Sequence, residues 1–533
     1  MSGNDVPYPA RISSTPSADG KQQGFWRAFQ VQQRQLRLRL AAEQAQQLPT
    51  DQVQSHLNSY LTLIANSRPF TELHSAVVDL IAALHPWPLR WQKWVQWQSE
   101  LHFAIDYCRA NQLPVRQALF SAELAGLLLA WGQYHEAIAM AKQAITLAEQ
   151  YDLLVPLALG AFHLVEALNS MGQSQQAEEW LAQMEEKADR LAVANSAEQV
   201  QADTYFAWHK MKFLRRHGEL ARAIELGNRT VNALNASIRI DNHQLAEAYV
   251  QRSTILWANA QYDLALADLD QAISLFTEVG DLLAAEIARG NMGLVYYSMG
   301  RLGDAERITR KTILQMEEAN ANWELIRVLG NLVAIHMARG DLSSASYYLA
   351  RQMDMVNRFD DTNQMMLARS NQATLHLCQG HYAQALAALQ PIRSFYHDQG
   401  YKDVETINLL EISSCYYGLG QIDKAIEFAR QAEAICETTD LDPLRIFVLR
   451  HLATLPVEEP RWPLAINALA LADEYSRPVE KAACLFTLAQ LTGSKDERDA
   501  YWHRGRALMQ EIGALDWLKG CSPENLPFIP YML

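Results

Sequence analysis

Apolar and polar residues alternate with helical spacing along most of this chain, and the pattern recurs about every 40 residues. Alanine marks the phase of the repeat, with successive spacings of 40, 46, 42, 40, 40, 40, 40 and 40 residues at Ala137, Ala177, Ala223, Ala265, Ala305, Ala345, Ala385, Ala425 and Ala465. Five residues earlier stand Gly132, Gly172, Gly218, Ala260, Gly300, Gly340, Gly380, Gly420 and Pro460. A phase held from residue 137 to residue 465 predicts stacked copies of one helical unit.

The copy around Gly300 shows what one unit contains. Residues 282–299 have apolar positions at helical spacing, and Gly300 ends this first helix because glycine adopts the left-handed conformation without a Cβ penalty. A second helix follows over residues 303–318. Ala305 lies near its start, where a small side chain lets the two helices approach closely, and Thr312 takes a second interface position one heptad later. Pro456, Pro460 and Pro463 surround the ninth turn and predict a kink or a short loop there.

The two ends of the chain depart from this pattern. Residues 1–23 are rich in Ser, Gly, Pro and Asp and are expected to be disordered, whereas residues 24–91 predict about three helices outside the repeat phase. The first of these is amphipathic and basic; a cap on the solenoid explains it better than membrane or nucleic-acid contact. Trp91, Trp94 and Trp97 form a helical stripe that suits core packing, with an aromatic docking patch as the alternative. Residues 516–533 form an apolar tail expected to dock on the last repeat.

The run Met292-Gly293-x-x-Tyr296, followed by Gly300-x-Leu302-x-x-Ala305, resembles the tetratricopeptide signature. The resemblance covers residues 92–515 and implies an all-α fold, a right-handed α-solenoid of about ten helix-turn-helix repeats with an N-terminal helical cap. Two departures are the 40-residue period, where 34 is usual, and the missing proline at the repeat end. Long repeats of this kind resemble those of kinesin light chains, LGN-type adaptors, peptide-sensing bacterial receptors and the sensor arms of STAND-type regulators. The phosphate-binding loop of the STAND ATPase domain does not occur in this sequence.

Composition narrows the possible functions. A formal net charge of −14 argues against a nucleic-acid partner, and no apolar run is long enough to predict a membrane span. Six cysteines without a C-x-x-C pair suit a reducing cytoplasm. The motifs of hydrolases, dinucleotide enzymes and zinc proteases are absent, so we expect no enzyme, no cofactor and no metal. His336 and His376 share one repeat position and could hold a metal, but substitution for a packed tyrosine is the simpler interpretation.

Asn291, Asn331 and Asn371 are the most informative polar positions, because they are spaced 40 and 40 residues apart on the first helices. The resemblance implies that these helices line the concave face, where asparagine ladders of kinesin light chains and LGN-type adaptors grip peptides. An amide side chain offers both a donor and an acceptor to a peptide backbone. The small residues Gly290, Gly330 and Ser370 precede the asparagines and would leave room for side chains of a ligand. The alternative is that asparagine is simply the family's usual residue at this position, since the column breaks at Gln251 and Glu411.

Further candidates surround the asparagine column, namely Arg289, Arg327, Arg369, Tyr297 and Tyr417. Three arginines favour an acidic partner or a C-terminal carboxylate. The sequence thus predicts a non-catalytic scaffold or regulatory adaptor that binds a partner protein or extended peptide in the concave groove. The partner could be a separately encoded protease or ATPase. The alternative function is the ligand-sensing arm of a bacterial STAND-type system, which would hold a small inducer or signal peptide in an enclosed aromatic pocket.

Overall fold

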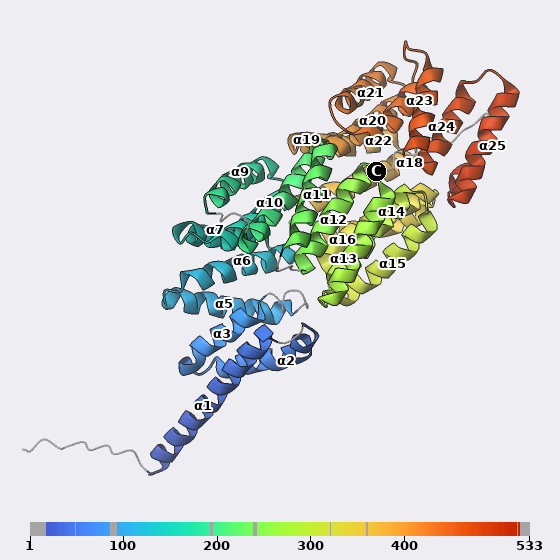
Figure 1. The fold of residues 1–533 in the computed structure, drawn as a ribbon. Helices are drawn as coiled ribbons and strands as arrows, with labels where there is room; N and C mark the ends of the chain where they lie inside the picture. The colour runs from blue at the N-terminus through green and yellow to red at the C-terminus, as the bar shows by residue number, and fades with distance from the viewer. Residues whose placement is uncertain are drawn as a thin grey trace, which may run out of the picture.

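The computed structural model describes residues 18–47, 50–85, 93–191, 196–237, 242–319, 321–358, 361–519 and 521–522, and its regular elements there are helices. Ten helix pairs follow one another from residue 114 to residue 511 and wind into a coil (Figure 1). The first helices of the pairs are α6 Pro114–Ala130, α8 Leu154–Ser170, α10 Ala197–Arg216, α12 Asn242–Ala258, α14 Leu282–Ser298, α16 Asn322–Arg339, α18 Thr362–Cys378, α20 Lys402–Gly418, α22 Asp442–Thr454 and α24 Pro478–Leu491. The second helices are α7 Tyr134–Gln150, α9 Ser174–Leu191, α11 Leu220–Ala236, α13 Tyr262–Glu278, α15 Leu302–Ala319, α17 Leu342–Val356, α19 Tyr382–Asp398, α21 Ile422–Glu437, α23 Arg461–Glu474 and α25 Lys495–Glu511. The prediction of an all-α solenoid with about ten repeats is confirmed.

The turn inside each pair has the geometry that the glycines predict. Gly300 has a φ of +71°, and its amide donates to the Tyr297 carbonyl at 2.9 Å, which closes the end of α14. Ala260 takes the same left-handed conformation with a φ of +55°. At the ninth turn, α22 ends at Thr454 and α23 begins at Arg461, so the prolines produce the expected short loop.

The marker alanines lie where two helices of a pair meet. All nine are at most 1% exposed. A larger side chain there would force the helices apart, because protein interiors are packed without spare volume. The sequence phase is therefore a packing requirement.

Helices at the N-terminal end continue the core of the solenoid. They are α1 Ala18–Gln47, α2 Thr50–Ser67, η1 Thr71–Leu73, α3 His74–Leu84 and α5 Trp94–Ala110. Leu38 of α1, Leu61 of α2, Ile81 of α3 and Trp97 of α5 belong to one apolar cluster with Phe120 of α6, so these helices cover the first repeat. Of the tryptophan stripe, Trp97 is buried and Trp94 is half-buried, whereas Trp91 lies outside the described residues. Of the segment expected to be disordered, residues 18–23 belong to α1 and residues 1–17 are not described.

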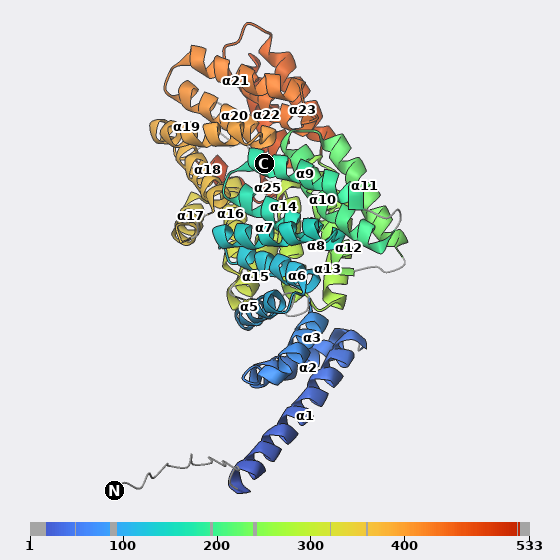
Figure 2. The same cartoon turned by 90° about the vertical axis from the view of Figure 1, so that its left-hand side faces the viewer.

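The coil closes on itself, so that repeats far apart in the sequence touch (Figure 2). We call this contact the inter-coil seam; it pairs Tyr134 with Asp361, Asn169 with Asn363, Ser174 with Gln399, Arg215 with Asp403, and Gly218 with Asp440. The paired residues are separated by 188 to 227 positions. We call the space along the first helices on the concave side of the coil the lumen.

The C-terminal helices make a second long-range contact. Val479 of α24, Met509 of α25 and Ala514 share an apolar cluster with Leu302 of α15 and Ile335 of α16. The expected tail is described over residues 516–519 and 521–522, and η2 Leu515–Leu518 begins one residue before it. Trp517 there donates from Nε1 to the Met337 carbonyl of α16 at 3.0 Å. Residues 520 and 523–533 lie outside the described residues.

Candidate functional site

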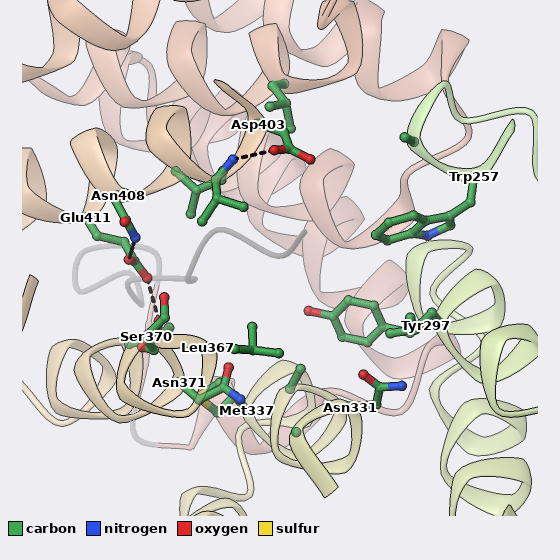
Figure 3. Close-up of a pocket in the computed structure, with 18 of the residues that line it drawn as sticks. Trp257, Tyr297, Asn331, Met337, Leu367, Ser370, Asn371, Asp403, Asn408 and Glu411 are labelled. Atoms are coloured by element: carbon green, nitrogen blue, oxygen red, sulfur yellow. Dashed lines mark hydrogen bonds between the residues drawn. The ribbon is translucent and has the colours of Figure 1, made fainter. Parts of the chain in front are cut away.

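The lumen contains a cavity of about 380 Å³ that is lined almost entirely by first helices. Trp257 of α12, Tyr297 of α14, Asn331 of α16, Asn371 of α18 and Glu411 of α20 all face it (Figure 3). An adjoining cavity of about 420 Å³ shares the side chain of Arg327 and other lining residues with it. Together the two spaces run past repeats from α10 to α22, and each is within the size range of ligand-binding pockets.

The asparagine column is divided between these two cavities. Asn331 and Asn371 line the 380 Å³ cavity, whereas Asn291 lines the adjoining one. Glu411, which the sequence presents as a break in the column, lies 40 residues after Asn371 and lines the same cavity as Asn331. The column therefore continues into the cavity as a carboxyl group.

The three amides differ in whether the protein satisfies them. Oδ1 of Asn291 accepts a hydrogen bond from Nη1 of Arg327 at 2.9 Å. Nδ2 of Asn371 donates to Oε1 of Gln352 at 3.4 Å. Asn331 is 9% exposed, and its Nδ2 has no hydrogen-bond partner within the described part of the chain. Asn331 is thus the member of the column whose amide nitrogen is buried without a hydrogen-bond partner in the described structure.

The small residues before the asparagines serve packing more than access. A Cβ atom at Gly330 would lie 2.6 Å from Nε2 of Gln352, and one at Gly290 would lie 3.3 Å from a methyl carbon of Thr312. Both neighbours come from the second helix of the same pair. Gly330 nevertheless lines the 380 Å³ cavity, so the room that it leaves for a ligand stays a prediction. Ser370 does line the cavity.

Glu411 is a buried carboxyl group of the cavity with a raised pKa. Its side chain is 2% exposed, and burial raises the pKa of the carboxyl group to about 7, although hydrogen bonds from Thr374 and Asn408 oppose the rise. Thr374 donates from Oγ1 at 2.5 Å and Asn408 from Nδ2 at 3.4 Å. Asn408 is itself 1% exposed, and its Oδ1 has no partner among the residues described. Sequence reasoning missed Asn408, because it lies outside the 40-residue register.

The arginines do not form the expected anion site. Arg289 does not line the cavity, and its Nη1 contacts Glu286. Arg369 is exposed and does not line the cavity either. Arg327 does line the cavity, but it bonds Glu324 at 3.0 Å as well as Asn291. Of the three arginines only Arg327 lines the cavity, and the preference for an acidic partner stays a prediction.

The two predicted tyrosines, Tyr297 and Tyr417, lie in different environments. Tyr297 is buried, and its hydroxyl points into the cavity opposite Leu367 (Figure 3). Burial raises the pKa of the Tyr297 hydroxyl, so that it stays a neutral hydrogen-bonding group. Tyr417 is 45% exposed and does not line the cavity.

The histidines of the repeat position do not converge on one another. His336 is buried and stacks on Tyr348 with ring centroids 5.4 Å apart, whereas His376 lies 6.0 Å from His381. Within the described ranges, no group of three or more His, Cys, Asp and Glu side chains is placed to hold a metal ion. None of the described helices is both long and apolar enough to cross a lipid bilayer.

Comparison with known proteins supports the repeat assignment. The tetratricopeptide repeat model matches residues 122–151, 246–277 and 408–439, which fall on the pairs α6–α7, α12–α13 and α20–α21. No curated protein matches the sequence.

Solved structures with a similar course of the chain include three helical-repeat proteins. A Rap protein complexed with competence and sporulation factor is 11% identical, covers 67% of this chain and 96% of its own, and has a TM-score of 0.48. Aspartyl phosphate phosphatase F from Bacillus subtilis is 12% identical, covers 65% of this chain and 93% of its own, and has a TM-score of 0.40. A chain of the Cut9-Hcn1 hetero-tetramer of the APC/C is 10% identical, covers 90% of this chain and 96% of its own, and has a TM-score of 0.47. The chain thus carries three segments that match the tetratricopeptide repeat model, each on one helix pair of a solenoid of ten pairs.

Proposed function

We propose that this protein is a non-catalytic scaffold that holds an extended segment of a partner protein or peptide inside its lumen. One observation carries the proposal: the two adjoining cavities run along the first helices of successive repeats and present amide and hydroxyl groups between apolar walls. A tetratricopeptide architecture serves many unrelated roles, so the proposal depends on this lumen and not on the fold.

A partner pull-down with luminal variants tests the proposal. Wild-type protein and the Asn331→Ala/Asn371→Ala variant would be compared in lysate of the native host, with Arg369→Ala/Tyr417→Ala as the matched control outside the cavity. A stoichiometric partner that the luminal variant loses and the control retains supports the lumen as the binding site. A partner retained equally by all three proteins contradicts it and moves the interface to another surface.

A small inducer is the second candidate occupant. The 380 Å³ cavity is large enough for one, and Trp257 and Tyr297 supply aromatic walls at neighbouring levels. This alternative corresponds to a sensor arm of the STAND type. It predicts that a small-molecule extract of the host, and no protein, raises the melting temperature of the wild-type protein but not of the luminal variant.

A further inference from the structure

Helix α1 carries apolar side chains on two faces, and one of these faces belongs to the core. Leu38 and Ala41 are at most 4% exposed and pack in the apolar cluster of the N-terminal helices. Large apolar side chains on another face of α1 are 43% to 56% exposed, namely those of Trp26, Phe29, Leu36 and Leu40. Figures 1 and 2 both show α1 projecting from the solenoid. A contiguous exposed apolar stripe of this kind marks an interaction surface.

The exposed stripe has the spacing of a coiled coil. Positions 26, 29, 33, 36 and 40 are separated by 3, 4, 3 and 4 residues, which is the heptad pattern of a and d positions. Gln33, at an a position, is the one polar member and is also exposed. A stripe confined to a and d positions is the narrow seam of a coiled coil, whereas a helix that packs on a globular core carries a wider apolar face.

From this stripe we propose that α1 pairs with α1 of a second copy of this chain, as a parallel and in-register coiled coil over residues 26–40. The pair would carry two lumens in one particle. This inference does not depend on the function proposed for the lumen, because the stripe lies outside the cavities described above.

The polar member of the stripe favours the parallel register. In that register Gln33 lies opposite its own copy, and each amide can donate to and accept from the other. In an antiparallel pair a positions meet d positions, so Gln33 would lie against Phe29 or Leu36 of the second copy and its amide would be buried without a partner. A single polar residue at an a position is known to specify the register of a coiled coil.

The arginines beside the stripe are compatible with the same register. In a parallel coiled coil, each g position faces the e position of the next heptad on the other helix. Arg37 at e therefore faces Gln32 of the second copy, and Arg39 at g faces Gln44. Each guanidinium donor thus meets an amide oxygen as its acceptor, and the arginines do not oppose each other.

The cap core supplies a helix that is ready to pair. Leu38 of α1 packs in one cluster with Ile81 of α3, so α1 does not have to be nucleated when two copies associate. Glu43 takes the next d position and would face its own copy, so the two helices separate after residue 40. The buried residues Ala41 and Ala45 join α1 to the cap core at that point.

Sedimentation velocity of the full-length protein over a wide range of concentrations tests the pairing. We expect the wild-type protein to reach twice the mass of one chain as the concentration rises. Leu36→Glu places two carboxylates opposite each other in the seam and should keep the protein monomeric. The matched control is Ala28→Glu, which adds the same charge at an exposed position of α1 outside the a and d positions and should dimerise as the wild type does.

Thermal unfolding separates loss of pairing from loss of folding. Leu36 is 56% exposed, so its replacement removes little from the core of the single chain. At concentrations where the wild-type protein is monomeric, Leu36→Glu should therefore have the same unfolding midpoint as the wild type.

The variant Leu40→Cys tests the register. In the parallel pair the two new cysteines face each other and should form a disulfide-linked dimer under mild oxidation, which a non-reducing gel detects. In an antiparallel pair that sets Phe29 opposite position 40, they would lie about 16 Å apart along the helix axis, too far for a disulfide. The wild-type protein, which contains six cysteines, is the control and should not cross-link.

Three outcomes would overturn the proposal. A wild-type protein that stays monomeric at every concentration overturns the pairing, and co-sedimentation of that monomer with phosphatidylserine vesicles would assign the stripe to a lipid surface. A dimer that persists in Leu36→Glu places the interface elsewhere. Loss of the dimer in Leu36→Glu without cross-linking of Leu40→Cys overturns the parallel register.

Discussion

The inter-coil seam and the lumen share Arg215 of α10 and Asp403 of α20, yet two other buried polar groups in them differ in whether the protein satisfies them. In the seam, Asp361 is buried and accepts hydrogen bonds from Tyr134 at 2.6 Å, Trp323 at 2.8 Å and the amide of Gln364 at 2.8 Å. In the lumen, Asn331 is similarly buried but leaves its donor unused. The carboxylate of Asp361 is satisfied by the protein, whereas the amide nitrogen of Asn331 is buried without a partner in the described structure.

This difference separates stability from recognition within one structure. A satisfied buried carboxylate stabilises the fold because its removal leaves several donors without partners. A buried amide without a hydrogen-bond partner destabilises the fold, and so does a buried carboxyl group that is ionised without a counter-charge. Substitutions in the seam should therefore lower stability, and removal of polarity or charge from the lumen should raise it or leave it unchanged.

The largest effect is expected for Asp361→Ala in the seam. The substitution leaves Tyr134, Trp323 and the Gln364 amide without their acceptor, and we expect the free energy of unfolding to fall by about 3–5 kcal/mol. Urea unfolding at pH 7.5 measures this loss. The exposed pair of Asp354 with Arg358 offers the control, since Asp354→Ala should cost less than about 0.5 kcal/mol. A loss below about 1 kcal/mol for Asp361→Ala would show that the seam does not hold the coil.

In contrast to Asp361→Ala, Glu411→Gln should raise the free energy of unfolding. The folded-state pKa of about 7 lies above the ordinary value of 4.5, so the folded protein binds more protons than the unfolded chain between these two values. Stability contributed by this group is therefore highest below pH 4.5 and falls by about 3 kcal/mol as the pH rises to 7. Glu411→Gln should remove this fall, and its gain over the wild type should be greatest at pH 8.

A neighbouring carboxyl provides the matched control for that titration. Glu405 lies on the same helix and accepts hydrogen bonds from Lys402 at 2.8 Å and His397 at 2.6 Å, which hold the pKa of its carboxyl below the ordinary value. Glu405→Gln should therefore destabilise the protein at pH 8. Urea titrations of both variants at pH 5 and pH 8 check the two signs, and a shared sign would contradict the contrast between them.

The smallest effect is expected for a substitution that belongs to neither region. Ala385 is completely buried between the two helices of one pair, and Ala385→Leu should overpack them at a cost of about 1–3 kcal/mol. Ala387 lies on the same helix α19 and is exposed, so Ala387→Leu should leave the unfolding midpoint almost unchanged. An equal cost for the two variants would mean that the 40-residue phase does not mark the interface.

Much of the fold could be read from particular residues. Gly300, Ala305 and their equivalents predicted the helix ends, the turn conformation and the close approach of each helix pair, because these are local requirements of one repeat. The site was predicted less well. The 40-residue register identified Asn331 and Asn371. It did not predict that Arg289 and Arg327 each form an ion pair with a glutamate of their own helix. Nothing in the register marks Asn408.

The sequence by itself determined the repeating unit, its length and the face on which the asparagine column lies, since each depends on contacts between residues within about one repeat. Only the tertiary structure decided that the coil closes, because the seam joins Tyr134 to Asp361 and Arg215 to Asp403 across roughly five repeats. Small rotations between successive repeats accumulate along a solenoid, and no single repeat encodes their sum. That sum sets which polar groups meet across the seam and which, like Nδ2 of Asn331 and Oδ1 of Asn408, are left buried without a partner in the described structure.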